Sequence, residues 1–273
     1  MKKAIIVLSF GTSYLDALEK NIVPMEREVE ERYGKEYKVI RAFTSHKIIK
    51  KLKKEHDMSI FTPEEALESL LNEGYEEVTI QPLHIIPGQE FDYIKKVTII
   101  YKDKFTSLRL GRPLIYFQSD EVNLDYDDLV CAISNNLPKD KIVVLAGHGT
   151  HHPGNSCYGC FQNRLRDLDH GNIIIATIEA YPSLENAIKY LKDKNIQRVV
   201  LAPFLLVVGD HARNDIFSSE EDSWASTLKR EGIEVEEFNV GLGEYKEVRN
   251  IYMKHLEDAL SGRFQGFGEN LKG

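Results

Sequence analysis

Cysteine is scarce in this sequence, with only three among 273 residues, at Cys131, Cys157 and Cys160. Three cysteines do not make a disulfide framework, so we expect a reduced, cytoplasmic setting. The sequence also lacks any apolar stretch near the roughly 18 residues that a membrane span needs. The apolar run near the N-terminus stops at Phe10, and no small-residue cleavage site follows it. We therefore expect a first strand there, and neither a signal peptide nor membrane insertion.

Clustered positive charge is missing as well. The 35 Lys and Arg residues are outnumbered by 43 Asp and Glu residues, which gives a formal net charge of −8 without a long basic run. Because binding to nucleic-acid phosphates needs clustered Lys and Arg, we do not expect nucleic acid as a partner. A small anionic substrate stays open, since a local basic patch can lie on an acidic protein. The content of 42% hydrophobic residues is that of a globular protein with a sizeable core.

Strand and helix patterns alternate along the chain, which predicts an α/β protein with parallel sheets and right-handed crossovers. The expected strands are Ala4–Phe10, Tyr37–Phe43, Glu77–Ile86, Ser107–Leu110, Lys141–Ala146, Asn172–Ile178, Arg198–Val207 and Ile233–Asn239. The expected helices are Leu15–Tyr33, Ser45–Glu55, one opening at Thr62, Glu90–Tyr101, Asn123–Asn136, Ser156–Leu168, Ser183–Lys192, one within Gly209–Arg230, and Tyr245–Ala259.

The two halves of the sequence align with each other. A shift of 138 residues places Ser9-Phe10-Gly11-Thr12 on Gly147-His148-Gly149-Thr150, and it places Arg41 on Glu179. Internal similarity of this kind predicts two structural copies of one unit. In both copies the glycines permit a sharp turn directly after a strand, and Gly147 and Gly149 leave the His148 imidazole uncrowded.

A second shift, of 121 residues, aligns Gly74–Gly88 with Asn195–Gly209 and places Glu90 opposite His211. We expect two similar α/β domains, residues 1–120 and 121–273, related by a pseudo-twofold axis. Their strand ends would face a shared cleft, and a final helix over 245–261 could pack back on the first domain. No second chain is required to complete such a cleft.

Three chemically versatile residues, His148, Glu179 and His211, each follow an expected strand. They lie 31 and 32 residues apart, about one βα unit per step, so parallel strands would bring them together. Two imidazoles and a carboxylate suit a borderline divalent metal such as cobalt, nickel, iron or zinc. Each residue also has a structural interpretation: a turn residue for His148, a helix-start acid for Glu179 and a helix cap for His211. The repeat favours the metal site because it places all three at one cleft.

Seven motifs spread over the whole chain resemble those of the class II tetrapyrrole chelatases, and most closely the anaerobic sirohydrochlorin cobaltochelatases of the CbiK type. They are Val7–Ser13, Arg41–Ser45, Leu83–Ile86, Gly147–Gly149, Glu179–Pro182, Gly209–His211 and Asp222–Trp224. The resemblance implies two Rossmann-like domains around a cleft. It implies an enzyme that inserts Co²⁺ into the tetrapyrrole sirohydrochlorin, without an organic cofactor, in anaerobic cobalamin biosynthesis.

The resemblance also implies roles for individual residues. The metal ligands would be His148, Glu179 and His211, and the first histidine would also be the catalytic base. By the repeat argument Glu90 faces the site, where it could take part in catalysis by relaying metal ions or protons. Our own candidates for binding the substrate are Phe10 against the ring face and Arg41 and Arg213 on the carboxylates. His84 could line the cleft, although a structural histidine near a strand end is the favoured interpretation.

Other interpretations of the sequence stay open. The same donors could serve iron or nickel, with this or another tetrapyrrole, because divalent affinities follow the metal more than the site. A metal or tetrapyrrole carrier without catalytic activity is a further alternative. Metal-dependent hydrolysis would need an obvious base and an oxyanion pocket, and the sequence shows neither clearly. Cys157 and Cys160 have the spacing of a redox or zinc pair, but we expect them to be packing residues.

Overall fold

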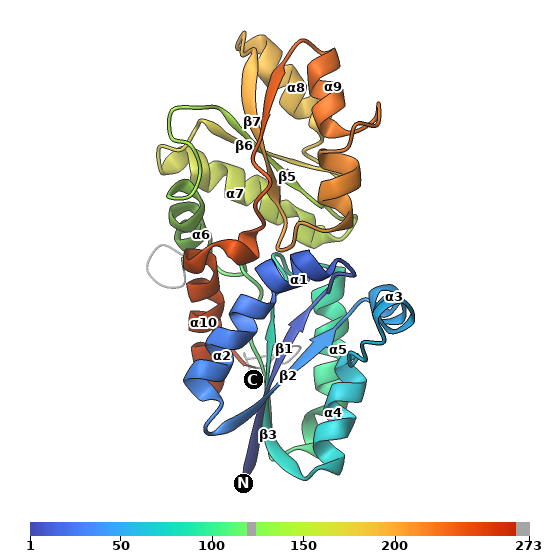
Figure 1. Cartoon of the computed structure of the whole chain (residues 1–273). Coiled ribbons are helices and arrows are strands. Elements are labelled where there is room, and N and C mark those ends of the chain that lie inside the picture. Colours follow the sequence, from blue (N-terminus) through green and yellow to red (C-terminus); the bar gives the residue numbers. More distant parts are fainter. Residues whose placement is uncertain (119–123, 266–273) are drawn as a thin grey trace. The chain divides into compact units, whose positions relative to one another are not determined.

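The computed structural model describes residues 1–118 and 124–265 of the chain. The fold consists of two compact units, one comprising Met1–Tyr116 and Arg249–Gly273 and the other Phe117–Val248 (Figure 1). The expected helix start at Asn123 and the expected domain boundary between residues 120 and 121 lie outside the described residues. No helix in the described ranges is both long and apolar enough to cross a membrane.

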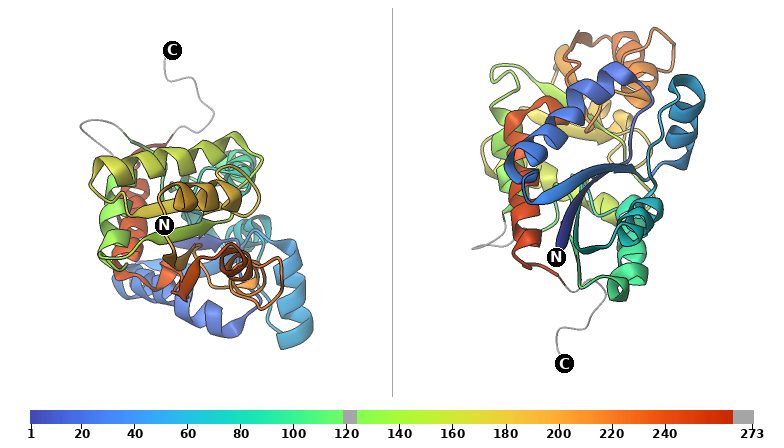
Figure 2. Two further views of the ribbon diagram at one scale, coloured as in Figure 1. Left: turned by 90° about the horizontal axis from the view of Figure 1, so that it is seen from above. Right: turned by 60° about the horizontal axis from the view of Figure 1, so that its bottom comes forward.

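The first unit is built on a parallel four-stranded sheet with the strand order β2-β1-β3-β4. Its strands are β1 (Lys2–Ser9), β2 (Tyr37–Phe43), β3 (Tyr75–Pro82) and β4 (Ser107–Leu110). Its helices are α1 (Leu15–Asn21), α2 (Val23–Tyr33), α3 (His46–His56), α4 (Pro63–Asn72), α5 (Gln89–Tyr101) and most of α10 (Lys246–Leu260). The helices α1, α2 and α10 lie on one side of this sheet and α4 and α5 on the other (Figures 1 and 2).

Two expectations for the first unit differ from the structure. The single helix predicted over Leu15–Tyr33 is two helices that meet at Ile22, because Pro24 follows and starts a new helix at its first turn. The third strand ends at Pro82 instead of Ile86. The start of α4 is as expected: the Thr62 hydroxyl accepts from the Glu65 N–H, and the Glu65 carboxylate accepts from the Thr62 N–H.

The second unit repeats this plan, with a parallel sheet of strand order β6-β5-β7-β8. Its strands are β5 (Val143–Gly147), β6 (Ile173–Thr177), β7 (Arg198–Phe204) and β8 (Glu234–Glu237). Its helices are α6 (Asp125–Ser134), α7 (Ser156–Asp167), α8 (Leu184–Asp193) and α9 (Trp224–Arg230). Buried side chains of α8 and α9 pack on one face of the sheet, and Phe161 of α7 stacks on Phe204 of the other face.

The internal repeat is confirmed by the identical strand order of the two sheets. Gly11 and Gly149, which the sequence alignment pairs, both have the left-handed backbone, with φ angles of +93° and +80°. In each unit the first strand pairs with the third: Leu8 with Pro82 in the first unit and Ala146 with Pro203 in the second. Pro82 and Pro203 are therefore equivalent, in agreement with the shift of 121 residues.

The sequence alignment of Arg41 with Glu179 is wrong. Val7 pairs with Arg41 in the first sheet, and the equivalent Leu145 pairs with Ile175 in the second, so Ile175 is the counterpart of Arg41. The alignment had matched the two helix N-caps, Ser45 of α3 and Ser183 of α8. The connection from strand to helix is four residues longer in the second unit, and Glu179 lies within that longer loop.

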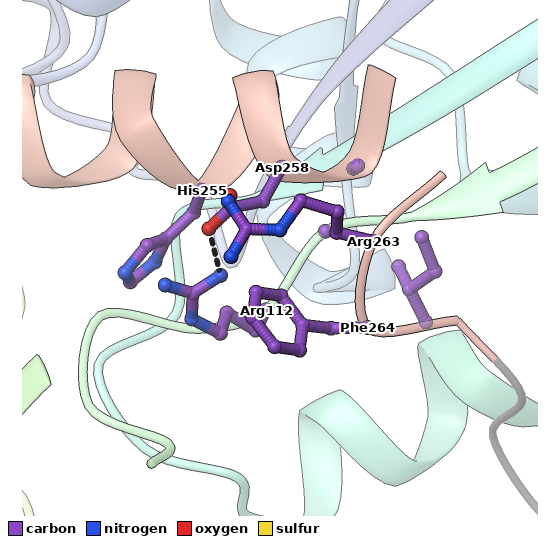
Figure 3. Close-up of a pocket in the computed structure, with 8 residues that line it drawn as sticks. Arg112, His255, Asp258, Arg263 and Phe264 are labelled. Carbon is purple, nitrogen blue, oxygen red and sulfur yellow. Dashed lines mark hydrogen bonds and ion pairs between the residues drawn. The ribbon is translucent and has the colours of Figure 1, made fainter. Parts of the chain in front are cut away.

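The C-terminal helix α10 joins the first unit through buried polar contacts. Arg112 and Asp258 form an ion pair at 2.7 Å with side chains that are 2% and 11% exposed, and Arg263 contacts the same carboxylate at 3.1 Å. Figure 3 shows these residues together with His255 and Phe264. The centroid of the Phe264 ring lies 5.0 Å from the Arg112 guanidinium carbon. The crevice that they line has no room for a water molecule, so it is a packed junction.

We predict that Asp258→Ala destabilises the first unit by about 3 kcal/mol, because it removes the carboxylate partner of a buried guanidinium. The measurement is chemical denaturation followed by circular dichroism. The control is Asp193→Ala, which breaks the exposed pair between Lys189 and Asp193 and should cost less than about 0.5 kcal/mol. Equal effects of the two substitutions would contradict the prediction.

His84 supplies a prediction on pH. Both of its ring nitrogens are buried and have no hydrogen-bond partner among the described residues, and burial lowers the pKa of the imidazole to about 4. The unfolded chain binds this proton near pH 6.5, so the folded protein should lose stability as the pH falls from about 6.5 to about 4. In His84→Phe this loss should be smaller by up to about 3 kcal/mol. His56→Gln, at an exposed site on α3, should keep the wild-type pH dependence, and an unchanged dependence in His84→Phe would refute the assignment.

Candidate metal site

The candidate ligands of the second unit lie at the carboxyl edge of its parallel sheet. His148 directly follows β5, Glu179 lies two residues after β6, and His211 lies in the segment between β7 and α9. The Glu179 N–H donates to the His148 carbonyl at 2.9 Å, which ties the two loops together beyond the last strand residues. The topology thus places all three residues where open parallel sheets bind their ligands.

The two glycines around His148 are required for different reasons. Gly149 has a φ of +80°, which only glycine adopts without strain, and a Cβ there would lie 2.9 Å from the Cβ of Thr177. Gly147 does not have a positive φ, but a Cβ on it would lie 2.7 Å from the ring of Tyr158. The Tyr158 hydroxyl in turn accepts from the Gly149 N–H at 3.3 Å. The turn that carries His148 is therefore fixed by close packing as well as by backbone angle.

The imidazoles of His148 and His211 face each other directly. Their Nε2 atoms are 3.0 Å apart, and the rings are nearly perpendicular with centroids 4.4 Å apart. The Nδ1–H of His148 donates to the Gly149 carbonyl at 2.8 Å, and the Nδ1–H of His211 donates to Asp215 Oδ2 at 2.6 Å. With the ring protons on Nδ1, both Nε2 lone pairs point at one region of space.

This distance fits two ligands of one metal ion. Imidazole nitrogens bind first-row divalent ions at about 2.0–2.1 Å, so two of them at a right angle are about 3.0 Å apart. Two imidazole nitrogens match the preference of cobalt, nickel, iron and zinc for borderline ligands. The side chains are 41% exposed for His148 and 39% for His211, so an ion can reach the nitrogens from solvent.

Glu179 approaches the pair from the other side. Its Oε2 lies 3.7 Å from Nδ1 of His148, not from Nε2, and its side chain is 45% exposed. Across residues 1–118 and 124–265 no group of three or more His, Cys, Asp or Glu side chains is arranged to hold a metal ion. The structure thus brings the two histidines together as donors and leaves Glu179 beside them. Glu179 also lines a hollow of about 380 Å³ with Tyr181, Ser183 and Asn186.

The other candidate site residues differ in how exposed they are and in whether other side chains already bind them. Phe10 is 47% exposed at the end of β1, and Glu90 is the second residue of α5, where a helix dipole favours an acid. Arg41 already donates from Nε and Nη2 to both carboxylate oxygens of Glu26, and these hydrogen bonds raise its pKa. Arg213 is half-buried in the turn that follows His211.

Sequence reasoning missed two residues of this site, Asp215 and Tyr158. Asp215 could have been found from its spacing, because a residue four positions after His211 lies on the same helical face. Tyr158 carried no signal in the sequence, since its role depends on the close approach of α7 to the glycine turn.

The two cysteines of α7 do not contribute thiolates. Burial raises the pKa of the Cys157 and Cys160 thiols, and all three cysteines of the chain are free. A protonated thiol is a weak metal ligand and nucleophile, so the packing role expected from the sequence fits the structure. His152 is also engaged locally, since its Nδ1 accepts from the Gly154 N–H at 3.0 Å.

Solved structures share this fold at low sequence identity. SirB from Bacillus subtilis with Fe³⁺ superposes with a TM-score of 0.62 at 14% identity, covering 97% of this chain and 99% of that one. The sirohydrochlorin chelatase SirB from Bacillus subtilis subspecies spizizenii in complex with cobalt gives 0.61 at 13% identity, covering 96% and 97%. These similarities establish the chelatase fold of the chain.

Closer relatives are found by sequence. The sirohydrochlorin cobaltochelatase of Salmonella typhimurium is 37% identical over 264 residues, which cover 96% of this chain and 97% of that protein. The sirohydrochlorin cobaltochelatase CbiKC of Nitratidesulfovibrio vulgaris is 30% identical over 269 residues, covering 95% and 91%. The model of the cobalt chelatase (CbiK) family matches residues 3–261. The chain therefore belongs to the cobalt chelatase (CbiK) family of metal chelatases.

Proposed function

We propose that the protein inserts Co²⁺ into sirohydrochlorin and releases two protons from the macrocycle. Membership of the cobalt chelatase family supports the reaction class, and two relatives that match nearly the whole chain carry the name of this activity. The single observation that carries the proposal is the pair of Nε2 atoms 3.0 Å apart on His148 and His211. The substrate metal binds there, with its remaining positions open toward the ring.

The two imidazoles also account for one of the two protons. An imidazole that holds the metal through Nε2 cannot take a proton through the same lone pair. As cobalt moves to the pyrrole nitrogens, the facing lone pairs of His148 and His211 become free, and together they can hold one pyrrole proton between the two Nε2 atoms. The second pyrrole proton passes to solvent or to the Glu179 carboxylate, which by then has released the metal.

Glu179 serves as a third ligand in this proposal. Its backbone is held to His148, but its half-exposed side chain is free to rotate toward the Nε2 side. A negative oxygen ligand offsets the charge of the ion before transfer and is a poorer partner for the neutral ring complex afterwards. A side chain that binds and then swings away suits a metal that must leave.

The candidates in the first unit are proposed to act on the macrocycle. Phe10 offers an exposed aromatic face for the ring, and Glu90 offers a carboxylate for metal or proton relay. Arg41 can bind a substrate carboxylate through Nη1 or by exchanging Glu26, and Arg213 is a second cation for this purpose. His84, with buried ring nitrogens, would line the ring site by shape.

The choice of metal is proposed from the relatives and not from the donor set, because two imidazoles and a carboxylate also suit Fe²⁺ and Ni²⁺. We further propose a cytoplasmic reaction, since the substrate needs no membrane and the three cysteines are all free thiols. No organic cofactor is needed, because metal insertion changes no oxidation state.

The first prediction of the proposal concerns the histidines. His148→Ala and His211→Ala should each lower the rate of cobalt insertion into sirohydrochlorin by at least about 100-fold, because each removes a metal ligand and a proton acceptor. Insertion is followed anaerobically by the absorbance change of the macrocycle, with Co²⁺, Ni²⁺ and Fe²⁺ in separate reactions. His170→Ala, in the loop after α7 of the same unit, is the control and should keep the wild-type rate. A wild-type rate in either of the first two variants would refute the assignment.

A second prediction tests whether the Glu179 carboxylate contributes to cobalt binding. Glu179→Gln should raise the KM for cobalt by about tenfold or more, which corresponds to the loss of about 1.4 kcal/mol of binding. The matched control is Glu185→Gln, an acid-to-amide change six residues later at the start of α8.

A carrier without catalytic activity would bind cobalt and sirohydrochlorin but show no increase in insertion rate over the uncatalysed reaction.

A further inference from the structure

Asp215 is the residue of the site to which neither sequence nor family resemblance assigned a role. Its Oδ2 lies 2.6 Å from Nδ1 of His211, the shortest contact that either imidazole of the pair makes. We propose that Asp215 is a positioning residue that fixes His211 as the Nδ1–H tautomer and aims its Nε2 lone pair at the metal. The inference rests on the proposed function only for the identity of the ion.

The local backbone holds the two side chains in register. His211 and Asp215 are four residues apart across a π-helical turn, Ala212–Ile216, which the Phe217 N–H closes by donating to the Ala212 carbonyl at 3.0 Å. Ala212 and Ile216 are fully buried in the core of the second unit and anchor the turn. The outward positions of the same turn therefore present the carboxylate to the imidazole at a fixed distance.

A fixed tautomer matters because a neutral imidazole carries one proton that can sit on either nitrogen. A proton on Nε2 would block the metal and would point at the other histidine. A carboxylate on Nδ1 keeps the proton there and makes Nε2 a better donor to a cation, as carboxylate partners of metal-binding histidines do. Nδ1 of His148 donates to the neutral Gly149 carbonyl at 2.8 Å, and the Glu179 carboxylate lies 3.7 Å from this nitrogen, beyond hydrogen-bond distance. Among the described residues, the carboxylate that accepts directly from an Nδ1 of the pair is Asp215, on His211.

The wild-type protein provides a first test that needs neither metal nor substrate. Long-range ¹H–¹⁵N correlation spectra report which ring nitrogen of a histidine carries the proton. In the metal-free protein at alkaline pH, His211 should be the Nδ1–H tautomer, because the Asp215 carboxylate beside this nitrogen can only accept a hydrogen bond. An Nε2–H tautomer would overturn the inference whatever the activity of the enzyme.

The second test measures the affinity for Co²⁺ alone, through the visible absorption of the bound ion. Asp215→Ala should weaken cobalt binding by about 10- to 100-fold and change the spectrum, because the ligand loses its orientation. Asp215 is 44% exposed, so the substitution leaves no buried cavity. The matched control is Asp210→Ala, which removes an equal charge directly beside His211 and the hydrogen bond that the Asp210 carboxylate accepts from Asn214. Equal weakening in the control would mean that only net charge matters, and would overturn the inference.

A double-mutant cycle separates positioning from general support of the turn. If Asp215 acts through His211, then Asp215→Ala should have no further effect on cobalt affinity in a His211→Ala background. The same loss in both backgrounds would overturn the inference. The tautomer measurement and the double-mutant cycle could both support the positioning role of Asp215 while the enzyme inserts no cobalt into sirohydrochlorin. In that case the positioning role stands and the proposed function is wrong.

Discussion

The candidate metal site depends on the close approach of two imidazole nitrogens. His148 and His211 approach to 3.0 Å through Nε2, while Nδ1 of each ring is engaged as a hydrogen-bond donor. Two nitrogen lone pairs at this separation repel each other, and a cation bound by both nitrogens relieves that repulsion, so the arrangement favours metal binding. The parallel sheet, the glycine turn and the π-helical turn hold the rings in this opposition.

The internal repeat explains why only one unit has this chemistry. Both units make the same sharp turn after their first strand, with a left-handed glycine at Gly11 and at Gly149. The residue before that glycine is Phe10 in one unit and His148 in the other, and the sequence alignment predicts that Glu90 is the counterpart of His211. The backbone is thus preserved, and the side chains at the strand ends have diverged. All three candidate metal ligands belong to the second unit, whereas Phe10, Arg41, His84 and Glu90 belong to the first.

Much of the fold could be predicted because each buried strand is an apolar run that ends in a turn signal. The repeat correctly predicted that the third strands of the two units are equivalent, since Pro82 and Pro203 occupy matching positions, although both strands end earlier than expected. The repeat alignment failed for Glu179 because it matched the similar helix caps Ser45 and Ser183 instead of the paired strand residues. The loop after β6 is four residues longer than the loop after β2, so Glu179 has no counterpart in the first unit. Asp215 was missed for another reason: its spacing of four residues from His211 places both on one helical face, but no sequence motif marked this short segment as helical.

A chelatase must bind its metal and then surrender it, and the observed donor set suits both steps. A closed site with four fixed ligands would retain the ion, as structural zinc sites do. Here the two imidazoles are fixed by their Nδ1 hydrogen bonds, and the Glu179 carboxylate beside them is half-exposed on a loop. In the proposed mechanism the fixed pair would recognise the ion, and Glu179 would let the coordination number change during transfer. On that proposal, the four-residue expansion of the loop after β6, which carries Glu179, would distinguish a site for transfer from a site for storage.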